Sequence, residues 1–158
     1  MEKKKYELTS ETKVINGVEL HRIKALKSFG NIKEGEFGGW IESEKNLSQY
    51  GNAWVYGNAM AEENAWVGGT AKVCGDATVC GDAKVRETSD YILFKNWWSS
   101  GRYFTWTRSN NKWKVGCFYG SGEELIAKAY KDSEKSGREY ERIVKYVESI
   151  LKEEKENN

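Results

Sequence analysis

This sequence lacks long apolar runs, has almost no excess of charge of one sign and contains a single histidine. No stretch stays apolar for the roughly 18 residues that a membrane-spanning helix needs, so we expect no membrane partner. The 25 basic and 24 acidic residues nearly cancel, which argues against binding duplex nucleic acid through many phosphates. The basic N-terminus, MEKKKYELTS, is followed by no apolar core, so we expect no signal peptide.

The scarcity of cysteine and histidine limits disulfide and metal chemistry. Cys74, Cys80 and Cys117 are three in number and lack the spacing of a disulfide framework, so we expect a reducing, cytoplasmic compartment. Structural zinc sites take four ligands, and the chain has neither a CxxC pair nor a histidine near a cysteine. We therefore predict no metal site and no resident cofactor.

A repeat of six residues runs from Gly51 to Arg86. Its blocks are GNAWVY, GNAMAE, ENAWVG, GTAKVC, GDATVC and GDAKVR, with alanine third in every block and valine fifth in five of the six. Because side chains alternate faces along a strand, these two positions point the same way. Glycine with asparagine or aspartate tolerates the positive φ of a tight corner. The pattern therefore predicts a turn of three sides, one block to a side, in which each block stacks in parallel on the block three places further along the chain.

The pattern V-x-G-[ND]-A-x resembles the hexapeptide repeat of left-handed β-helix proteins, a superfamily rich in acyl- and nucleotidyltransferases that are usually trimeric. Residues 20–59 and the segments GCFYGSGEELIAKAY and GREYERIVKYV are similar to a group of bacterial and phage or prophage proteins. That group is labelled as unproven transferases or polymer-forming proteins of unknown activity. The resemblance implies a left-handed helix sense for the repeat and a homotrimer.

The expected fold is mainly β and has three parts. Residues 1–38 form an N-terminal capping hairpin, since Asn16-Gly17 between two apolar-rich stretches is a strong hairpin signal. Residues 39–88 form a short left-handed parallel β-helix. Residues 89–158 form a small α+β module, a three-strand meander followed by two helices.

Catalysis has one candidate residue. Enzymes of the hexapeptide superfamily typically use a histidine as general base and bind coenzyme A between subunits. His21 is the candidate here, but it precedes the repeat, in a strand of the predicted hairpin, where a histidine is ordinarily a surface or packed residue. No insertion interrupts residues 51–86, so no catalytic loop is expected there, and no pair of acids stands out. The sequence leans away from an enzyme, with a coenzyme A-dependent acyltransferase as the alternative.

The outward positions of the repeat carry aromatic and basic side chains. The predicted stacking places Trp54 beside Lys72 and Trp66 beside Lys84. The aromatics either bury against another subunit or the C-terminal module, or form a shelf for a planar ligand such as a nucleotide base, with basic side chains near its phosphates. Trp97-Trp98 in a turn either joins the core of the small module or presents a loop to a partner. The candidate surface for a ligand or an interface comprises Trp54, Tyr56, Trp66, Lys72, Lys84, Arg86, Arg102, Trp97 and Trp98.

The preferred function is a non-catalytic, oligomeric binding or assembly protein of phage or prophage type. It would sequester a small, nucleotide-like host ligand or engage a host protein, in the host cytoplasm if the protein is phage-encoded. A purely structural scaffold is a second alternative. We expect self-association, as a homotrimer by the resemblance, because so short a repeat buries only a thin core by itself.

Overall fold

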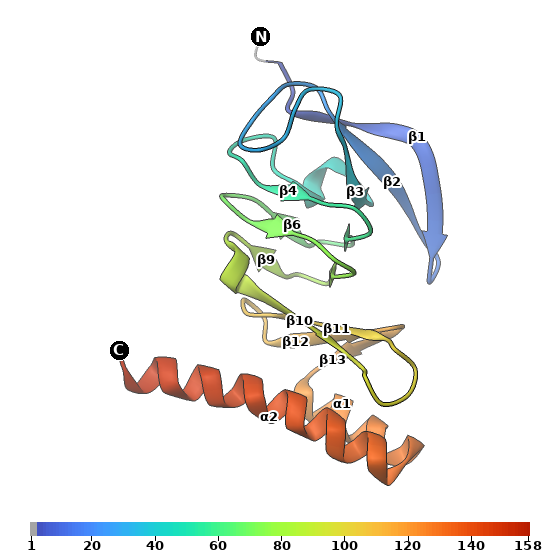
Figure 1. Cartoon of the computed structure of the whole chain (residues 1–158), viewed down its shortest axis with the longest axis vertical. Helices are drawn as coiled ribbons and strands as arrows, with labels where there is room; N and C mark the ends of the chain where they lie inside the picture. Colours follow the sequence, from blue (N-terminus) through green and yellow to red (C-terminus); the bar gives the residue numbers. More distant parts are fainter. Residues whose placement is uncertain (1–2) are drawn as a thin grey trace.

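The computed structural model describes residues 3–158, and its elements follow one another along an elongated molecule (Figure 1). A hairpin comes first, then a series of short strands, a four-stranded sheet and two helices. The strands are β1 Tyr6–Ile15, β2 Val18–Ala25, β3 Phe37–Ile41, β4 Trp54–Val55, β5 Met60–Ala61, β6 Trp66–Val67, β7 Lys72–Val73, β8 Thr78–Val79, β9 Lys84–Val85, β10 Tyr91–Lys95, β11 Tyr103–Thr107, β12 Lys112–Val115 and β13 Phe118–Gly120. The helices are α1 Gly122–Asp132 and α2 Glu134–Glu156, and the short 3₁₀ turns are η1 Glu44–Asn46 and η2 Thr88–Asp90.

The repeat segment, residues 51–86, forms the six shortest strands, β4 to β9. Each of the first three pairs in parallel with the strand three blocks further on, which places Trp54 beside Lys72 and Trp66 beside Lys84. These two neighbour pairs and the spacing of three blocks are confirmed. The third and fifth residues of every block are fully buried, as predicted: Ala53, Val55, Ala59, Ala61, Ala65, Val67, Ala71, Val73, Ala77, Val79, Ala83 and Val85.

The prediction of a left-handed parallel β-helix as the fold class is wrong. Parallel pairing within the repeat segment is limited to strands of two residues, because the other residues of each block form the corner between strands. The largest sheet has five strands in the order β1-β2-β3-β5-β8 and is mixed, since β1, β2 and β3 pair antiparallel. The next largest, β10-β11-β12-β13, is antiparallel throughout. The part of the chain that the structure describes is thus a mixed-sheet fold that contains short parallel pairs.

The N-terminal hairpin turns where the sequence predicted it. Asn16 and Gly17 have φ angles of 51° and 82°, the left-handed conformations that a tight hairpin turn requires. The second strand of the hairpin, β2, pairs with β3 and so covers the edge of that strand. The hairpin therefore lies along one side of the stacked short strands (Figure 1).

Side chains of the C-terminal sheet satisfy backbone groups at the last level of the repeat segment. The hydroxyl of Thr105 accepts a hydrogen bond from the backbone N–H of Thr78 at 2.9 Å. The hydroxyl of Ser109 accepts one from the N–H of Lys84 at 2.8 Å. The strands β8 and β9 have no further strand beyond them, so these hydroxyls replace the partner that another level would supply.

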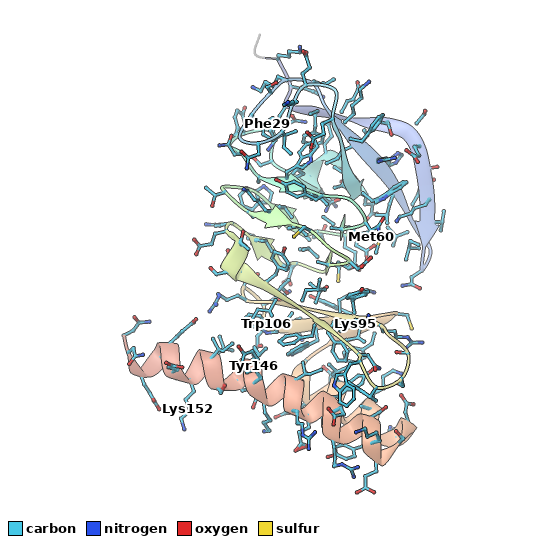
Figure 2. All side chains as sticks on the ribbon, in the orientation of Figure 1. Phe29, Met60, Lys95, Trp106, Tyr146 and Lys152 are labelled. Carbon is cyan, nitrogen blue, oxygen red and sulfur yellow. The ribbon has the colours of Figure 1, made fainter. Side chains whose placement is uncertain are left out.

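The C-terminal module has four strands where the sequence predicted three. The last strand of the predicted meander is split by a turn at Gly116, whose φ is +57°. Its two halves, β12 and β13, pair antiparallel with each other. Trp106 is fully buried between this sheet and α2, whereas Lys152 points away from the body (Figure 2). Within residues 3–158, neither helix has the length and apolar character that crossing a membrane requires.

Trp54 belongs to the core of the chain itself, and neither to a ligand shelf nor to a surface buried by another subunit or by the C-terminal module. Its indole is fully buried and packs edge-on against Phe29 and Tyr6, with ring centroids 5.3 and 6.2 Å away. The absence of a side chain at Gly38 leaves room for the indole, since a Cβ there would lie 2.7 Å from the ring. The N-terminal segment therefore covers this side of the repeat and removes Trp54 from the surface.

Replacing Trp54 with alanine should lower the free energy of unfolding by about 3–5 kcal/mol, because the substitution opens a large cavity in the core. The matched control is Trp97→Ala, which removes an indole that is 70% exposed and should cost less than about 1 kcal/mol. Urea denaturation followed by circular dichroism measures both. Equal losses in the two variants would contradict the placement of Trp54 in the core.

Candidate functional site

A shallow groove of about 290 Å³ lies on the side of the repeat segment where β6 and β9 run in parallel. Trp66 comes from β6, Lys84 from β9 and Arg86 from just after β9. Lys45 on η1 and Asn64 at the corner before β6 complete the lining. We call these five residues the Trp66 groove. They come from three separate stretches of chain, and the parallel pairing of β6 with β9 brings the stretches together.

The indole of Trp66 is the floor of the groove. It is half-buried and lies against the backbone of Gly68, where any larger side chain would collide with the ring. The guanidinium carbon of Arg86 lies 5.7 Å from the ring centroid, within reach of a cation–π contact. Lys84 is the direct strand neighbour of Trp66. The aromatic surface is therefore bordered by positive charge.

The three basic side chains of the groove form no ion pair within 4.0 Å among the described residues. All three, Lys45, Lys84 and Arg86, are exposed. The Nζ of Lys45 donates a hydrogen bond to the side-chain oxygen of Asn64 at 2.9 Å, which leaves its charge uncompensated. Among residues 3–158, no acidic residue lines the groove. This arrangement attracts an anion.

Asn46 holds the two sides of the groove together from inside the protein. Its side-chain amide is fully buried and donates hydrogen bonds to the carbonyls of Glu63 and Ala65, at 3.1 and 2.8 Å. Its side-chain oxygen accepts a bond from the N–H of Ser43 at 2.9 Å. These bonds fix η1, which carries Lys45, against the corner that carries Asn64.

Three of the nine predicted surface residues meet in this groove: Trp66, Lys84 and Arg86. Two further ones come from the repeat segment but lie elsewhere. Lys72 is exposed on β7. Tyr56 is half-buried against the core that the hairpin and the repeat segment share.

The remaining predicted residues belong to the core or to the C-terminal module. Trp54 is in the core, and Arg102 lines a separate cavity beside β11 and β12. Trp98 packs against Tyr140 with ring centroids 5.5 Å apart and is partly buried against the core of the C-terminal module. Trp97 is exposed, with the Nζ of Lys135 5.2 Å from its ring centroid. The Trp97-Trp98 pair is therefore split between the surface and the core.

His21 lies on β2, away from the groove. Its side chain is 27% exposed, and its Nε2 lies 3.5 Å from a carboxylate oxygen of Glu19. It lines neither the Trp66 groove nor the cavity that holds Arg102. His21 is therefore a partly exposed residue next to a surface carboxylate.

Sequence reasoning missed Lys45 and Asn64. Lys45 lies before the regular repeat, in a stretch whose register the blocks do not define. A usable signal was Leu47, a fully buried residue that bridges in parallel to Val67 and therefore places η1 next to the corner before β6.

No model of a known protein family matches the chain, and no curated protein matches its sequence significantly. Together with the mixed sheet, this overturns the expected membership of the left-handed β-helix superfamily and of the group of bacterial and phage proteins. The homotrimer implied by that resemblance stays a prediction.

Replacing Asn46 with alanine should lower the free energy of unfolding by at least about 2 kcal/mol, because a buried backbone group left unpaired costs about 1–3 kcal/mol. Asn58→Ala is the matched control, since Asn58 occupies an exposed corner of the same repeat segment and should change stability little. Thermal or urea unfolding measures the difference. If the two variants were equally stable, Asn46 would not be the internal support of the groove.

Proposed function

We propose that this protein is a non-catalytic binding protein whose Trp66 groove takes a small anionic ligand with a planar ring, of the nucleotide class. The observation that carries the proposal is the joining of one aromatic surface with three cations that form no ion pair, Lys45, Lys84 and Arg86, in a groove that no described acidic residue lines. Nucleotides combine the two features that such a surface complements, a flat base and a phosphate.

Each side chain that lines the groove makes a different kind of contact with the proposed ligand. The indole of Trp66 offers a π-surface, and stacking of a base on an aromatic side chain contributes about 1–3 kcal/mol. The guanidinium of Arg86 suits phosphate oxygens because its N–H groups form a planar fork, and Lys84 adds a mobile point charge. The amide of Asn64 can exchange hydrogen bonds with a ring edge or a ribose hydroxyl.

The size of the groove restricts the ligand. Its volume of about 290 Å³ is at the lower end of the range for ligand pockets, about 300–1,000 Å³. A mononucleotide suits this volume better than a dinucleotide. The open shape leaves part of the ligand in solvent, so we expect modest affinity that falls as salt concentration rises.

Titration calorimetry with AMP, ADP and ATP at low salt tests the proposal. We expect binding that strengthens with the number of phosphates, because more negative charge meets the same three cations. Arg86→Ala should weaken binding at least about tenfold, since a hydrogen bond to a charged group contributes about 1.5–3 kcal/mol. Trp66→Ala should weaken it about fivefold or more through lost stacking.

Lys72→Ala is the matched control for the charge changes. Lys72 is an exposed lysine of the same repeat segment, but it lies outside the groove. It should leave nucleotide affinity unchanged. An equal loss in Lys72→Ala and Lys84→Ala, or binding of inorganic phosphate as tight as that of AMP, would contradict a site with a stacked base.

A further inference from the structure

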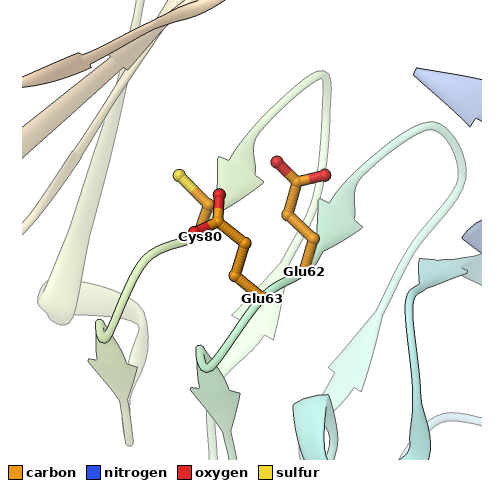
Figure 3. A group of neighbouring side chains, drawn as sticks. All are labelled: Glu62, Glu63 and Cys80. Carbon is orange, nitrogen blue, oxygen red and sulfur yellow. The ribbon is translucent and has the colours of Figure 1, made fainter. Parts of the chain in front are cut away.

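A second cluster of chemically reactive side chains lies around the corner that follows β5. It comprises Glu62, Glu63 and Cys80, whose carboxylate oxygens and thiol sulfur all lie within 4.8 Å of one another. Figure 3 shows the three side chains side by side on neighbouring stretches of the chain. Glu62 and Cys80 end blocks that are three places apart in the repeat, so the register that pairs Met60 with Thr78 also brings these two together. The cluster shares no residue with the Trp66 groove.

Burial makes this cluster unlike an ordinary group of surface acids. Glu62 is only 4% exposed and Cys80 only 2%, because the C-terminal sheet covers this corner. Burial raises the pKa of the Cys80 thiol to about 12 and also raises the pKa of Glu62.

Glu62 has no partner that explains its burial. Its carboxylate forms no hydrogen bond and no ion pair within 4.0 Å to any residue that the structure describes. Buried carboxylates are normally hydrogen-bonded, paired or bound to metal, since an isolated charge is costly away from water. Glu63, in contrast, is exposed, and its side chain is free to swing toward the other two. The buried carboxylate of Glu62 thus lies within 4.8 Å of a thiol and of a second carboxylate, a set of groups that can hold a cation.

The charged side chains around Glu62 include more carboxylates than lysines. Glu42 and Glu63 raise the pKa of Glu62, and Lys114 lowers it. Lys114 acts on Cys80 in the same direction. Lys114 therefore competes with a cation, but a single lysine faces three carboxylates.

We propose that Glu62, Glu63 and Cys80 form a binding site for a divalent metal ion of borderline softness, zinc above all. A thiolate favours zinc over magnesium or calcium, which prefer oxygen ligands. Two carboxylates and one thiolate carry three negative charges, which more than balance the two positive charges of the ion, and they leave a fourth position of a tetrahedral site for water. Ligand atoms around tetrahedral zinc lie about 3.5 Å apart, so the side chains must close in by roughly 1 Å. On binding, the S–H bond of Cys80 breaks, the sulfur keeps the electron pair and bonds to zinc, and the proton passes to solvent.

Titration of the full chain with zinc chloride, under reducing conditions and after treatment with chelator, tests the site. We expect one zinc ion per chain by calorimetry. Cys80→Ser and Glu62→Gln should each weaken binding at least about tenfold, the loss that even outer partners of a metal site commonly cause. Lys114→Met should tighten binding severalfold, because it removes the competing charge. Cobalt chloride should give a near-ultraviolet sulfur-to-cobalt absorption band that Cys80→Ser abolishes.

The double variant Cys74→Ser, Cys117→Ser is the matched control. Both of these cysteines are exposed, and neither belongs to the cluster, so the variant should bind zinc as tightly as the wild type. Loss of binding in this control, or no binding to the wild type, would overturn the proposal.

Thermal unfolding of Glu62→Gln separates a metal ligand from a structural carboxylate. Glu62 forms no ion pair with any residue that the structure describes, so its replacement by the isosteric amide removes no such contact when no metal is bound. The variant should therefore melt no lower than the wild type in chelator, and should gain nothing from zinc. A lower melting temperature in chelator would mean that Glu62 supports the fold, and would overturn the metal site.

Discussion

The parallel backbone register, which pairs each block of the repeat with the block three places further on, is the constraint on which the rest of this structure depends. It is built from a short ladder of hydrogen bonds, such as those from the N–H of Trp66 to the carbonyl of Ala83 and from the N–H of Met60 to that of Ala77, both 2.9 Å long. The buried alanines and valines keep this register, because a slip of one residue would turn them outward. The same register puts Trp66 beside Lys84 on one side and brings Glu62 to Cys80 at a corner. Both proposed sites are therefore products of one backbone arrangement.

Regular sequence patterns predicted regular geometry. The alanine and valine columns correctly identified the buried positions, and the block length correctly predicted which residues are neighbours, Trp66 and Lys84 among them. The Asn16-Gly17 turn was equally predictable, since few sequences tolerate two successive positive φ angles. The β-helix fold class was inferred from the repeat together with a resemblance, and the mixed sheet shows that this inference was wrong.

The sequence did not predict which outward residues of the repeat segment are covered by other parts of the chain. Trp54 and Trp66 occupy the same position in their blocks, yet Trp54 is fully buried and Trp66 borders a groove. The difference comes from Phe29 and Tyr6, which lie outside the repeat and pack on Trp54. Cys74 and Cys80 also share a block position, yet Cys74 is exposed and Cys80 is buried. A periodic sequence thus defines neighbours within its own strands but not which side a flanking segment will cover.

The central claim is that equivalent residues three blocks apart in the repeat segment lie side by side on parallel strands. Nuclear Overhauser contacts between backbone protons in an isotope-labelled sample test it most directly. The structure predicts contacts between Met60 and Thr78 and between Trp66 and Lys84. Contacts at any other spacing, or the pattern of antiparallel neighbours within residues 51–86, would contradict this account and remove the basis of both proposed sites.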